Sequence, residues 1–255
     1  MNIHELKDTA VRYVEEAGIY IKEEMKKSYH IDTKANKNDL VTDVDKNVEL
    51  LFKEKIEHDF PEHRLMGEEG SFEDIKDLDG IVWILDPIDG TMNFVHMSTN
   101  FAVSVGIFEN GKPLIGIILD VMNGELFVSL TGEGAYLNDK KLPLLEEKPL
   151  DEAIVSFNTG WVLKDEKLQH IVKQVRGTRS FGSAALELAY VAAGRLDAYI
   201  SMNLAPWDVA GGYALLQEVG GIATNYEGNK LSFLDKDTLF AANPYIYREI
   251  DAQLK

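Results

Sequence analysis

An apolar run that ends in two closely spaced aspartates is the feature of this sequence that most constrains its fold. Residues 81–85, Ile-Val-Trp-Ile-Leu, are β-branched, aromatic or aliphatic, which predicts a buried strand. Asp86 follows at once, and Asp89 comes three residues later in a turn that contains Pro87 and Gly90. Two carboxylates are therefore expected where a buried strand leaves its sheet.

The turn after this strand suits a bound cation. Pro87 fixes its own φ and Gly90 permits backbone angles closed to other residues, so the turn is stiff and can approach a ligand closely. Asp86, Asp89 and a peptide carbonyl between them offer hard oxygen ligands, which fit Mg²⁺ rather than zinc. Thr91 adds a hydroxyl beside them. The alternative is an ordinary strand exit with solvated aspartates, which is the commoner explanation of an isolated Asp-x-x-Asp.

A longer string favours the metal site. Residues 86–94 read Asp-Pro-Ile-Asp-Gly-Thr-Met-Asn-Phe, and the fixed letters of D-P-x-D-G-T-x-N-F are expected by chance with a probability on the order of 10⁻⁹ per position. This string resembles the signature of the inositol monophosphatase family of metal-dependent, lithium-sensitive phosphatases. The resemblance implies an α+β fold, a layered αβαβα sandwich shared with fructose-1,6-bisphosphatase, and a phosphatase activity.

Three further blocks resemble the family in its order along the chain. Residues 39–45, Asp-Leu-Val-Thr-Asp-Val-Asp, precede a predicted helix over 45–58, and residues 67–69 are Gly-Glu-Glu. Residues 207–211, Trp-Asp-Val-Ala-Gly, open a predicted helix over 206–220. Helix capping and the helix dipole also explain the acids at both helix starts, and a solvated turn explains the paired glutamates. From the residues alone, these explanations stay open.

The resemblance implies the residues that carry the chemistry. It makes the metal ligands Glu68, Asp86, Ile88 through its carbonyl, Asp89 and Asp208. They would hold two Mg²⁺ ions, or three as in some members. Thr91 and Asp45 would aim the attacking water, with Glu68 as a further catalytic residue. Lys34 and Asp39 are implied to lie close to the metals.

A second set of residues is implied to bind the substrate, and it comprises Asp89, Gly90, Thr91, Gly182, Ser183, Ala184, Ser201 and Asp208. Gly182 opens a predicted helix over 183–193, whose free amides can accept an anion. An N-cap by Ser183 is the simpler explanation of the same residues.

Ser201 is where this chain departs from the family pattern. It stands six residues before Trp207, a position at which inositol monophosphatases commonly place a glutamate that accepts hydrogen bonds from ring hydroxyls. A serine there removes a negative charge and a charge-assisted hydrogen bond. Together with Arg179, it indicates room for a bulkier or more anionic leaving group.

Composition excludes several classes of function. The chain has 255 residues, 45% of them apolar, with 43 acidic and 26 basic residues and a formal charge of −17, which opposes binding to nucleic acid or an anionic membrane. The absence of cysteine excludes disulfides, thiolate zinc sites and a cysteine nucleophile. With no signal pattern and no apolar run near the ~20 residues of a membrane span, a cytoplasmic protein is expected.

The remaining segments read as scaffold for one domain over 1–255, with an N-terminal metal-site lobe over about 1–146 and a C-terminal lobe over about 150–255. The predicted scaffold elements are a helix over 3–27, an antiparallel meander over 101–137, a strand over 153–158, a helix over 164–175, a basic turn over 176–179, a strand over 196–202, and strands with a short final helix over 221–255.

The sequence therefore predicts a Mg²⁺-dependent phosphomonoesterase that acts on a small phosphorylated metabolite. The resemblance implies a homodimer that hydrolyses inositol 1-phosphate with broad specificity, through a water activated by the metals. An NADP⁺ or sugar-bisphosphate phosphatase on the same fold is the alternative. A non-catalytic protein that binds divalent metal is the alternative from another class.

Overall fold

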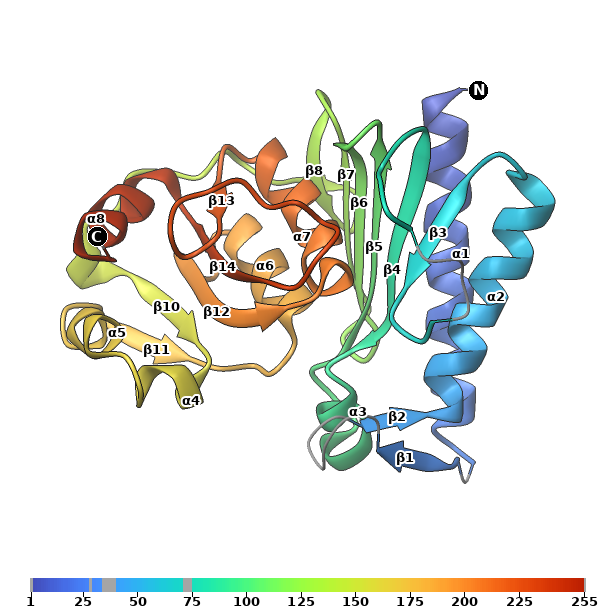
Figure 1. Cartoon of the computed structure of the whole chain (residues 1–255), viewed down its shortest axis with the longest axis horizontal. Coiled ribbons are helices and arrows are strands. Elements are labelled where there is room, and N and C mark those ends of the chain that lie inside the picture. Colours follow the sequence, from blue (N-terminus) through green and yellow to red (C-terminus); the bar gives the residue numbers. More distant parts are fainter. Residues whose placement is uncertain (1, 28, 34–39, 71–74, 255) are drawn as a thin grey trace.

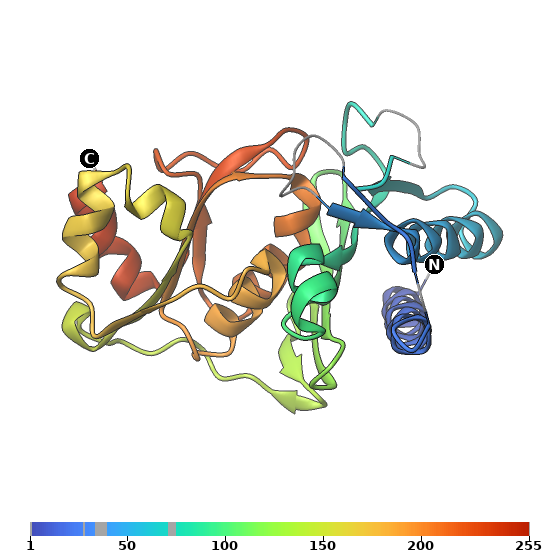
Figure 2. The same cartoon turned by 90° about the horizontal axis from the view of Figure 1, so that it is seen from below.

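The computed structural model describes residues 2–27, 29–33, 40–70 and 75–254, and these residues form five layers in the order α-β-α-β-α (Figure 1). The helical layers consist of α1 (Ile3–Glu24) with α2 (Asp43–Asp59), α6 (Ala184–Ala192) with α7 (Pro206–Glu218), and α5 (Glu166–Val172) with α8 (Pro244–Leu254). Figure 2 shows the same layers from below, with α6 and α7 enclosed between the two sheets. The predicted layered sandwich is confirmed.

A seven-stranded sheet carries the central motif. Its strands, in spatial order, are β3 (Arg64–Gly67), β4 (Ile81–Asp89), β5 (Ala102–Glu109), β6 (Lys112–Asp120), β7 (Glu125–Leu130), β8 (Gly134–Leu137) and β9 (Lys140–Lys141). Strands β3 and β4 are parallel, and every later neighbour pair is antiparallel, which confirms the predicted meander. A separate antiparallel pair, β1 (Ile31–Thr33) and β2 (Leu40–Thr42), precedes α2.

The two faces of this sheet pack against different helices. Along β4, Trp83 and Leu85 join the core formed with α1 and α2, whereas Val82 and Ile84 join the core formed with α6 and α7. This alternation follows from the two-residue period of a strand. Because the sheet is covered on both sides, its central strands are apolar on both faces.

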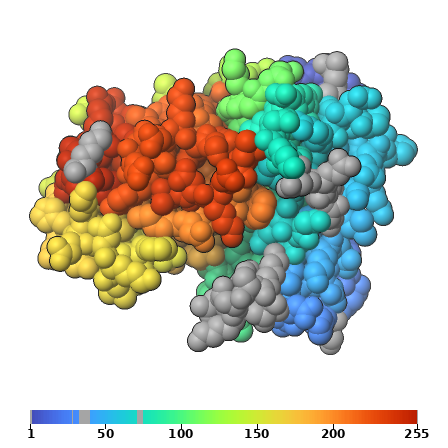
Figure 3. Space-filling view, in the orientation of Figure 1, coloured from blue at the N-terminus to red at the C-terminus, as the bar shows by residue number. Residues whose placement is uncertain are grey.

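Helix α7 packs very close to the seven-stranded sheet. A Cβ atom added to Gly211 would lie only 2.7 Å from the Ser104 Oγ atom and 3.1 Å from the Val105 carbonyl oxygen. Only glycine permits such an approach without displacing β5. In Figure 3 the orange and red part of the chain accordingly packs directly against the green and cyan part. The close approach brings the start of α7 to the end of β4.

The five-stranded sheet lies on the other side of α6 and α7. Its spatial order is β11 (Gly177–Arg179), β10 (Ile154–Phe157), β12 (Ala198–Leu204), β14 (Asp237–Ala242) and β13 (Ile222–Thr224). Strand β10 is parallel to β11 and β12, and β14 is antiparallel to β12 and β13. The basic turn predicted over 176–179 is therefore wrong, because residues 177–179 form the edge strand β11.

The helix predicted over 164–175 is also wrong in its extent. The structure has a shorter helix there, α5, and a separate short helix before it, α4 (Thr159–Val162). The Asp165 carboxylate accepts a hydrogen bond from the Lys167 N–H at 2.8 Å, so a new helix starts at this cap. The short helices α3 (Thr91–Met97) and η1 (Leu150–Glu152) complete the description. No helix within the described ranges has the length and apolar character needed to cross a membrane.

Candidate active site

A β-bulge at the end of β4 places Asp86 and Asp89 on the same side of the sheet. Asp86 pairs with Ser104 and Asp89 with Ala102, so β4 has one residue more than β5 between these two pairs. Residues three apart on a regular strand point to opposite faces, and the extra residue of a bulge cancels this difference. Both carboxylates therefore face the layer that contains α7.

The third carboxylate of the cluster is Asp208, in the first turn of α7. Its Oδ2 atom accepts a hydrogen bond from the Ala205 N–H at 2.7 Å, which fixes the side chain at the helix start. One carboxylate oxygen from each of Asp86, Asp89 and Asp208 lies within 4.8 Å of the other two. Asp86 is 1% exposed and Asp89 is 6% exposed. Buried oxygen donors this close together match the ligand preference of Mg²⁺ or Ca²⁺.

The electrostatics of the cluster also fit a bound cation. Burial, followed by the negative charge of Asp208, raises the pKa of Asp89 to about 8. Burial raises the pKa of Asp208 to about 6, and it raises the pKa of Asp86 well above its usual range. Carboxylates crowded in a buried site resist ionisation unless positive charge compensates them. A divalent cation would supply that charge.

Glu68 lies at the edge of this cluster. Strands β3 and β4 are parallel with Gly67 opposite Leu85, so Glu68 leaves its strand beside Asp86. Its negative charge raises the pKa of Asp86 and of Asp208. Glu68 stands outside the group of three whose oxygens lie within 4.8 Å of one another.

A buried glutamate that the sequence analysis missed holds the turn of Glu68. The Glu49 Oε2 atom accepts a hydrogen bond from the Glu69 N–H at 2.7 Å, and Glu49 is fully buried. Glu49 falls on the buried stripe of α2 with Asp45 and Phe52, at helical spacing. An acidic residue on the apolar stripe of a helix is the signal that could have identified it.

Asp45 serves both as a helix cap and as a partner of Thr91. Its Oδ2 atom accepts hydrogen bonds from the Thr42 hydroxyl and, at 2.9 Å, from the Thr42 N–H, which completes a capping box at the start of α2. Its Oδ1 atom accepts a hydrogen bond from the Thr91 Oγ1 atom at 3.3 Å. The same hydroxyl lies 3.1 Å from the Ile88 carbonyl oxygen. Asp45 is therefore a helix cap, and the same carboxylate contacts Thr91.

A cavity of about 490 Å³ adjoins the cluster and contains most of the residues predicted to bind the substrate. Those residues are Asp89, Gly182, Ser183, Ala184, Ser201 and Asp208. Ser201 is 3% exposed and belongs to the cavity wall, together with Trp161 and Tyr199, which the sequence analysis did not single out. The structure thus brings Asp89 of the central motif to the same cavity as the predicted residues from the C-terminal part of the chain.

The start of α6 is occupied by a carboxylate of the protein itself. Asp89 Oδ2 accepts hydrogen bonds from the Ser183 hydroxyl and, at 2.8 Å, from the Ala185 N–H. Ser183 also caps the helix by accepting a hydrogen bond from the Leu186 N–H at 3.3 Å. The expectation that this helix start accepts a substrate anion is therefore wrong for the Ala185 amide, which already binds Asp89.

The remaining predicted residues lie elsewhere. Arg179 is exposed on the edge strand β11, where its guanidinium donates to the Thr178 carbonyl oxygen at 2.8 Å, and it does not belong to the cavity wall. Lys34 and Asp39 lie outside the described residues. Lys236, just before β14, is a cation that the sequence analysis missed, and its charge lowers the pKa of Asp208.

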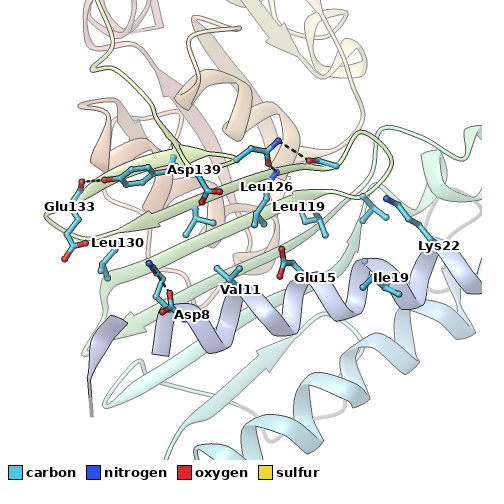
Figure 4. Close-up of a pocket in the computed structure, with 17 residues that line it drawn as sticks. Asp8, Val11, Glu15, Ile19, Lys22, Leu119, Leu126, Leu130, Glu133 and Asp139 are labelled. Atoms are coloured by element: carbon cyan, nitrogen blue, oxygen red, sulfur yellow. Dashed lines mark hydrogen bonds and ion pairs between the residues drawn. The ribbon is translucent and has the colours of Figure 1, made fainter. Parts of the chain in front are cut away.

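A larger groove of about 910 Å³ lies apart from this site, between α1 and strands β6 to β8 (Figure 4). Leu119, Leu126 and Leu130 of the sheet face Val11 and Ile19 of the helix across it. It lies on the α1 side of the seven-stranded sheet, whereas the aspartates lie on the α7 side. It is therefore separate from the carboxylate cluster.

Comparison with known proteins agrees with this geometry. The model of the family described as "Inositol monophosphatase family" matches residues 2–254. The inositol-1-monophosphatase of Bacillus subtilis (strain 168) is 51% identical over 254 residues, which cover 98% of this chain and 96% of the relative. The similarity therefore extends over almost the whole length of both proteins.

Solved structures show the same fold. A crystal structure of SaIMPase-II bound to inositol monophosphate has a TM-score of 0.88 and 39% identity, and the match covers 97% of this chain and 92% of that one. An IMPase/NADP phosphatase complexed with Mg²⁺ and phosphate has a TM-score of 0.91 and 26% identity over 98% and 95% of the two chains. This chain therefore belongs to the inositol monophosphatase family and is a phosphoric monoester hydrolase.

Proposed function

We propose that this phosphatase is Mg²⁺-dependent and hydrolyses inositol 1-phosphate with broad specificity. The observation that carries the proposal is the convergence of Asp86 and Asp89 with Asp208 beside a cavity of about 490 Å³. Two of these carboxylates come from an N-terminal lobe, residues 1–146, and the third from a C-terminal lobe, residues 150–255. The cavity between them would receive the substrate.

The carboxylates would hold two cations, and Glu68 could bind a third. Glu68, Asp86 and the Ile88 carbonyl would bind the first ion, and Asp86 with Asp89 and Asp208 would bind the second. Bound Mg²⁺ neutralises the negative charge on the attacking and leaving oxygens of an in-line displacement. Mg²⁺ fits this donor set because every ligand is a hard oxygen. The Mg²⁺ complex of the IMPase/NADP phosphatase supports the choice of metal.

Thr91 and Asp45 would position the attacking water. The Thr91 hydroxyl has two acceptors for its one proton, Asp45 and the Ile88 carbonyl, so its oxygen lone pairs can accept a hydrogen bond from water. Burial raises the pKa of Asp45 to about 6, against the opposing hydrogen bonds from Thr42. A carboxylate with that pKa can accept a proton near neutral pH.

The phosphate would bind at the start of α3. Gly90 caps this helix in the left-handed region at φ 93°, so the N–H groups of Gly90 and Thr91 begin the helix and can point at phosphate oxygens. Water would attack the phosphorus directly as it gives a proton to Asp45, the bond to the leaving oxygen would break, and that oxygen would take a proton from solvent. No covalent phosphoenzyme is formed.

The residue at position 201 bears on the identity of the leaving group. Ser201 lines the cavity at a position where inositol monophosphatases commonly have a carboxylate. An NADP⁺ or sugar-bisphosphate phosphatase is therefore the second candidate function, and the similarity to the IMPase/NADP phosphatase supports it.

A phosphate-release assay tests the proposal. The purified chain is given Mg²⁺ and a panel of monoesters that includes inositol 1-phosphate, fructose 1,6-bisphosphate and NADP⁺, and catalytic efficiencies are compared. We expect Mg²⁺-dependent release that EDTA abolishes and that Li⁺ inhibits at high millimolar concentration. Cation binding without release from any monoester would instead support the non-catalytic metal-binding protein. A homodimer, which the family resemblance supports, is tested on the same sample by sedimentation.

A further inference from the structure

A second buried glutamate, Glu187 on α6, lies beside the cavity and has no part in the mechanism above. It is 3% exposed. Its Oε1 atom accepts hydrogen bonds from the Phe181 N–H at 2.5 Å and from the Gly182 N–H at 3.3 Å. Further hydrogen bonds from Ser156 and Tyr199 favour its ionised form, although burial raises its pKa overall. Glu187 therefore binds a turn of the main chain rather than facing solvent.

That turn, residues 181–183, leads directly into the residues that hold Asp89. Ser183 donates to Asp89 Oδ2, and the Ala185 N–H donates to the same oxygen at 2.8 Å. From the other side, Asn93 Nδ2 donates to the Phe181 carbonyl oxygen at 2.7 Å. The turn is thus held between α3 and α6, and its last residue, Ser183, contacts Asp89.

We propose that Glu187 is a positioning residue for Asp89 and acts through the turn 181–183. With the turn in place, Asp89 Oδ2 is satisfied by Ser183 and Ala185, and Oδ1 is left for the cation. Without the carboxylate, two amides of a buried turn lose their acceptor, and the turn shifts to find another. This inference rests on the proposed function in one respect, namely that Asp89 binds a cation.

The test compares two replacements that remove the same charge. Glu187→Gln keeps an acceptor oxygen for the Phe181 and Gly182 amides, whereas Glu187→Met has similar length and no acceptor. The readout is Mn²⁺ affinity, measured by calorimetry and by the loss of the free-ion electron paramagnetic resonance signal. This readout requires no turnover. Circular dichroism and thermal melting establish that each variant is folded.

We expect Glu187→Met to bind Mn²⁺ about tenfold more weakly than Glu187→Gln, because loss of a residue that orients a metal ligand typically lowers affinity ~10- to 100-fold. Equal Mn²⁺ affinities for the two folded variants would overturn the inference. If Glu187→Met does not fold, Glu187→Asp replaces it, since it keeps the charge and withdraws the oxygens by one methylene. An affinity of Glu187→Asp equal to that of the unaltered chain would then overturn the inference.

Glu218 provides the matched control. This carboxylate, near the end of α7, also binds a turn of the main chain, accepting from the Gly132 N–H at 3.0 Å and the Gly134 N–H at 2.9 Å. Its turn joins β7 to β8 and has no contact with the aspartates. Glu218→Met and Glu218→Gln should bind Mn²⁺ equally well, and a tenfold difference there would show that the Glu187 effect is unspecific.

The outcome is separable from that of the proposed function. If the unaltered chain binds Mn²⁺ but releases no phosphate from any monoester, the phosphatase mechanism is contradicted, while the comparison of Glu187→Met with Glu187→Gln still decides the positioning role. If phosphate is released and the two variants bind Mn²⁺ equally, the positioning role alone is contradicted. If the unaltered chain binds no Mn²⁺, both fail.

Discussion

Asp86 and Asp89 lie on one face of the seven-stranded sheet although they are three positions apart on β4, because a bulge opposite Ser104 and Ala102 inserts one residue between them. Without that residue, one carboxylate would point into the core formed with α1 and α2. The bulge, together with the close approach of α7 at Gly211, assembles a cluster from segments more than a hundred residues apart in the chain.

The link between Thr91 and Asp45 leads to a prediction about the attacking water. Thr91→Ala removes the hydroxyl that lies 3.3 Å from Asp45, and in the proposed mechanism this hydroxyl acts chiefly in the transition state. We expect kcat to fall about 100-fold or more with little change in KM, as for loss of a group that aids proton transfer. Steady-state kinetics on inositol 1-phosphate measure both constants. Thr91→Ser keeps the hydroxyl and serves as the control, and an effect of Thr91→Ala on KM alone would assign Thr91 to substrate binding.

The crowded carboxylates predict how the metal-free protein responds to pH. Folding raises the pKa of Asp89 from an ordinary value of 3.8 to about 8 and that of Asp208 to about 6. At a pH between the ordinary and the raised pKa of each carboxyl group, the folded protein holds a proton that the unfolded chain has released. The free energy of unfolding therefore falls as pH rises through this range. In EDTA, we expect a lower melting temperature near pH 8 than near pH 5. Excess Mg²⁺ should raise the melting temperature more at the higher pH than at the lower one.

Asp208→Asn is the control for that experiment. It removes one titrating carboxylate from the cluster, so the fall in melting temperature between the two pH values should be smaller than in the unaltered chain. A fall of the same size in both proteins would assign the pH dependence to groups outside the cluster.

Ser201 leads to a prediction about specificity. Ser201→Glu restores a carboxylate to the cavity wall, where it can accept hydrogen bonds from ring hydroxyls and repel a second phosphate. Because a charge-assisted hydrogen bond contributes ~1.5 to 3 kcal/mol, we expect kcat/KM for inositol 1-phosphate to rise at least about tenfold relative to that for NADP⁺ or fructose 1,6-bisphosphate. An unchanged ratio would show that residue 201 does not contact the leaving group.

Much of the scaffold and most of the candidate site could be predicted from the sequence. The strand before Asp86 and the meander after it follow from residue type and turn spacing, and the family resemblance implied the five layers. The bulge could not be predicted, because it depends on which residues of β5 lie opposite β4. A regular strand would have separated the two aspartates.

The supporting glutamates show a second limit of sequence reasoning. A glutamate in a helix is usually solvated, so neither Glu49 nor Glu187 stood out. Every residue of α6 is buried, which makes Glu187 the one charged residue in an otherwise apolar helix. That contrast was visible in the sequence, but its meaning depends on the turn 181–183, which only the tertiary structure places against it. Arg179 lies on the edge strand β11, outside the cavity wall, and its place at the sheet edge also depends on the tertiary structure.

Asp86→Asn tests the central claim most directly, namely that the clustered aspartates hold the cations on which hydrolysis depends. The substitution preserves shape and removes the charge of the innermost carboxylate, and Asp43→Asn, at the exposed start of α2, is the control. Phosphate release from inositol 1-phosphate is measured at saturating Mg²⁺ on variants with unchanged circular dichroism. The account predicts no release above background for Asp86→Asn and normal release for Asp43→Asn. Near-normal release by Asp86→Asn would contradict it.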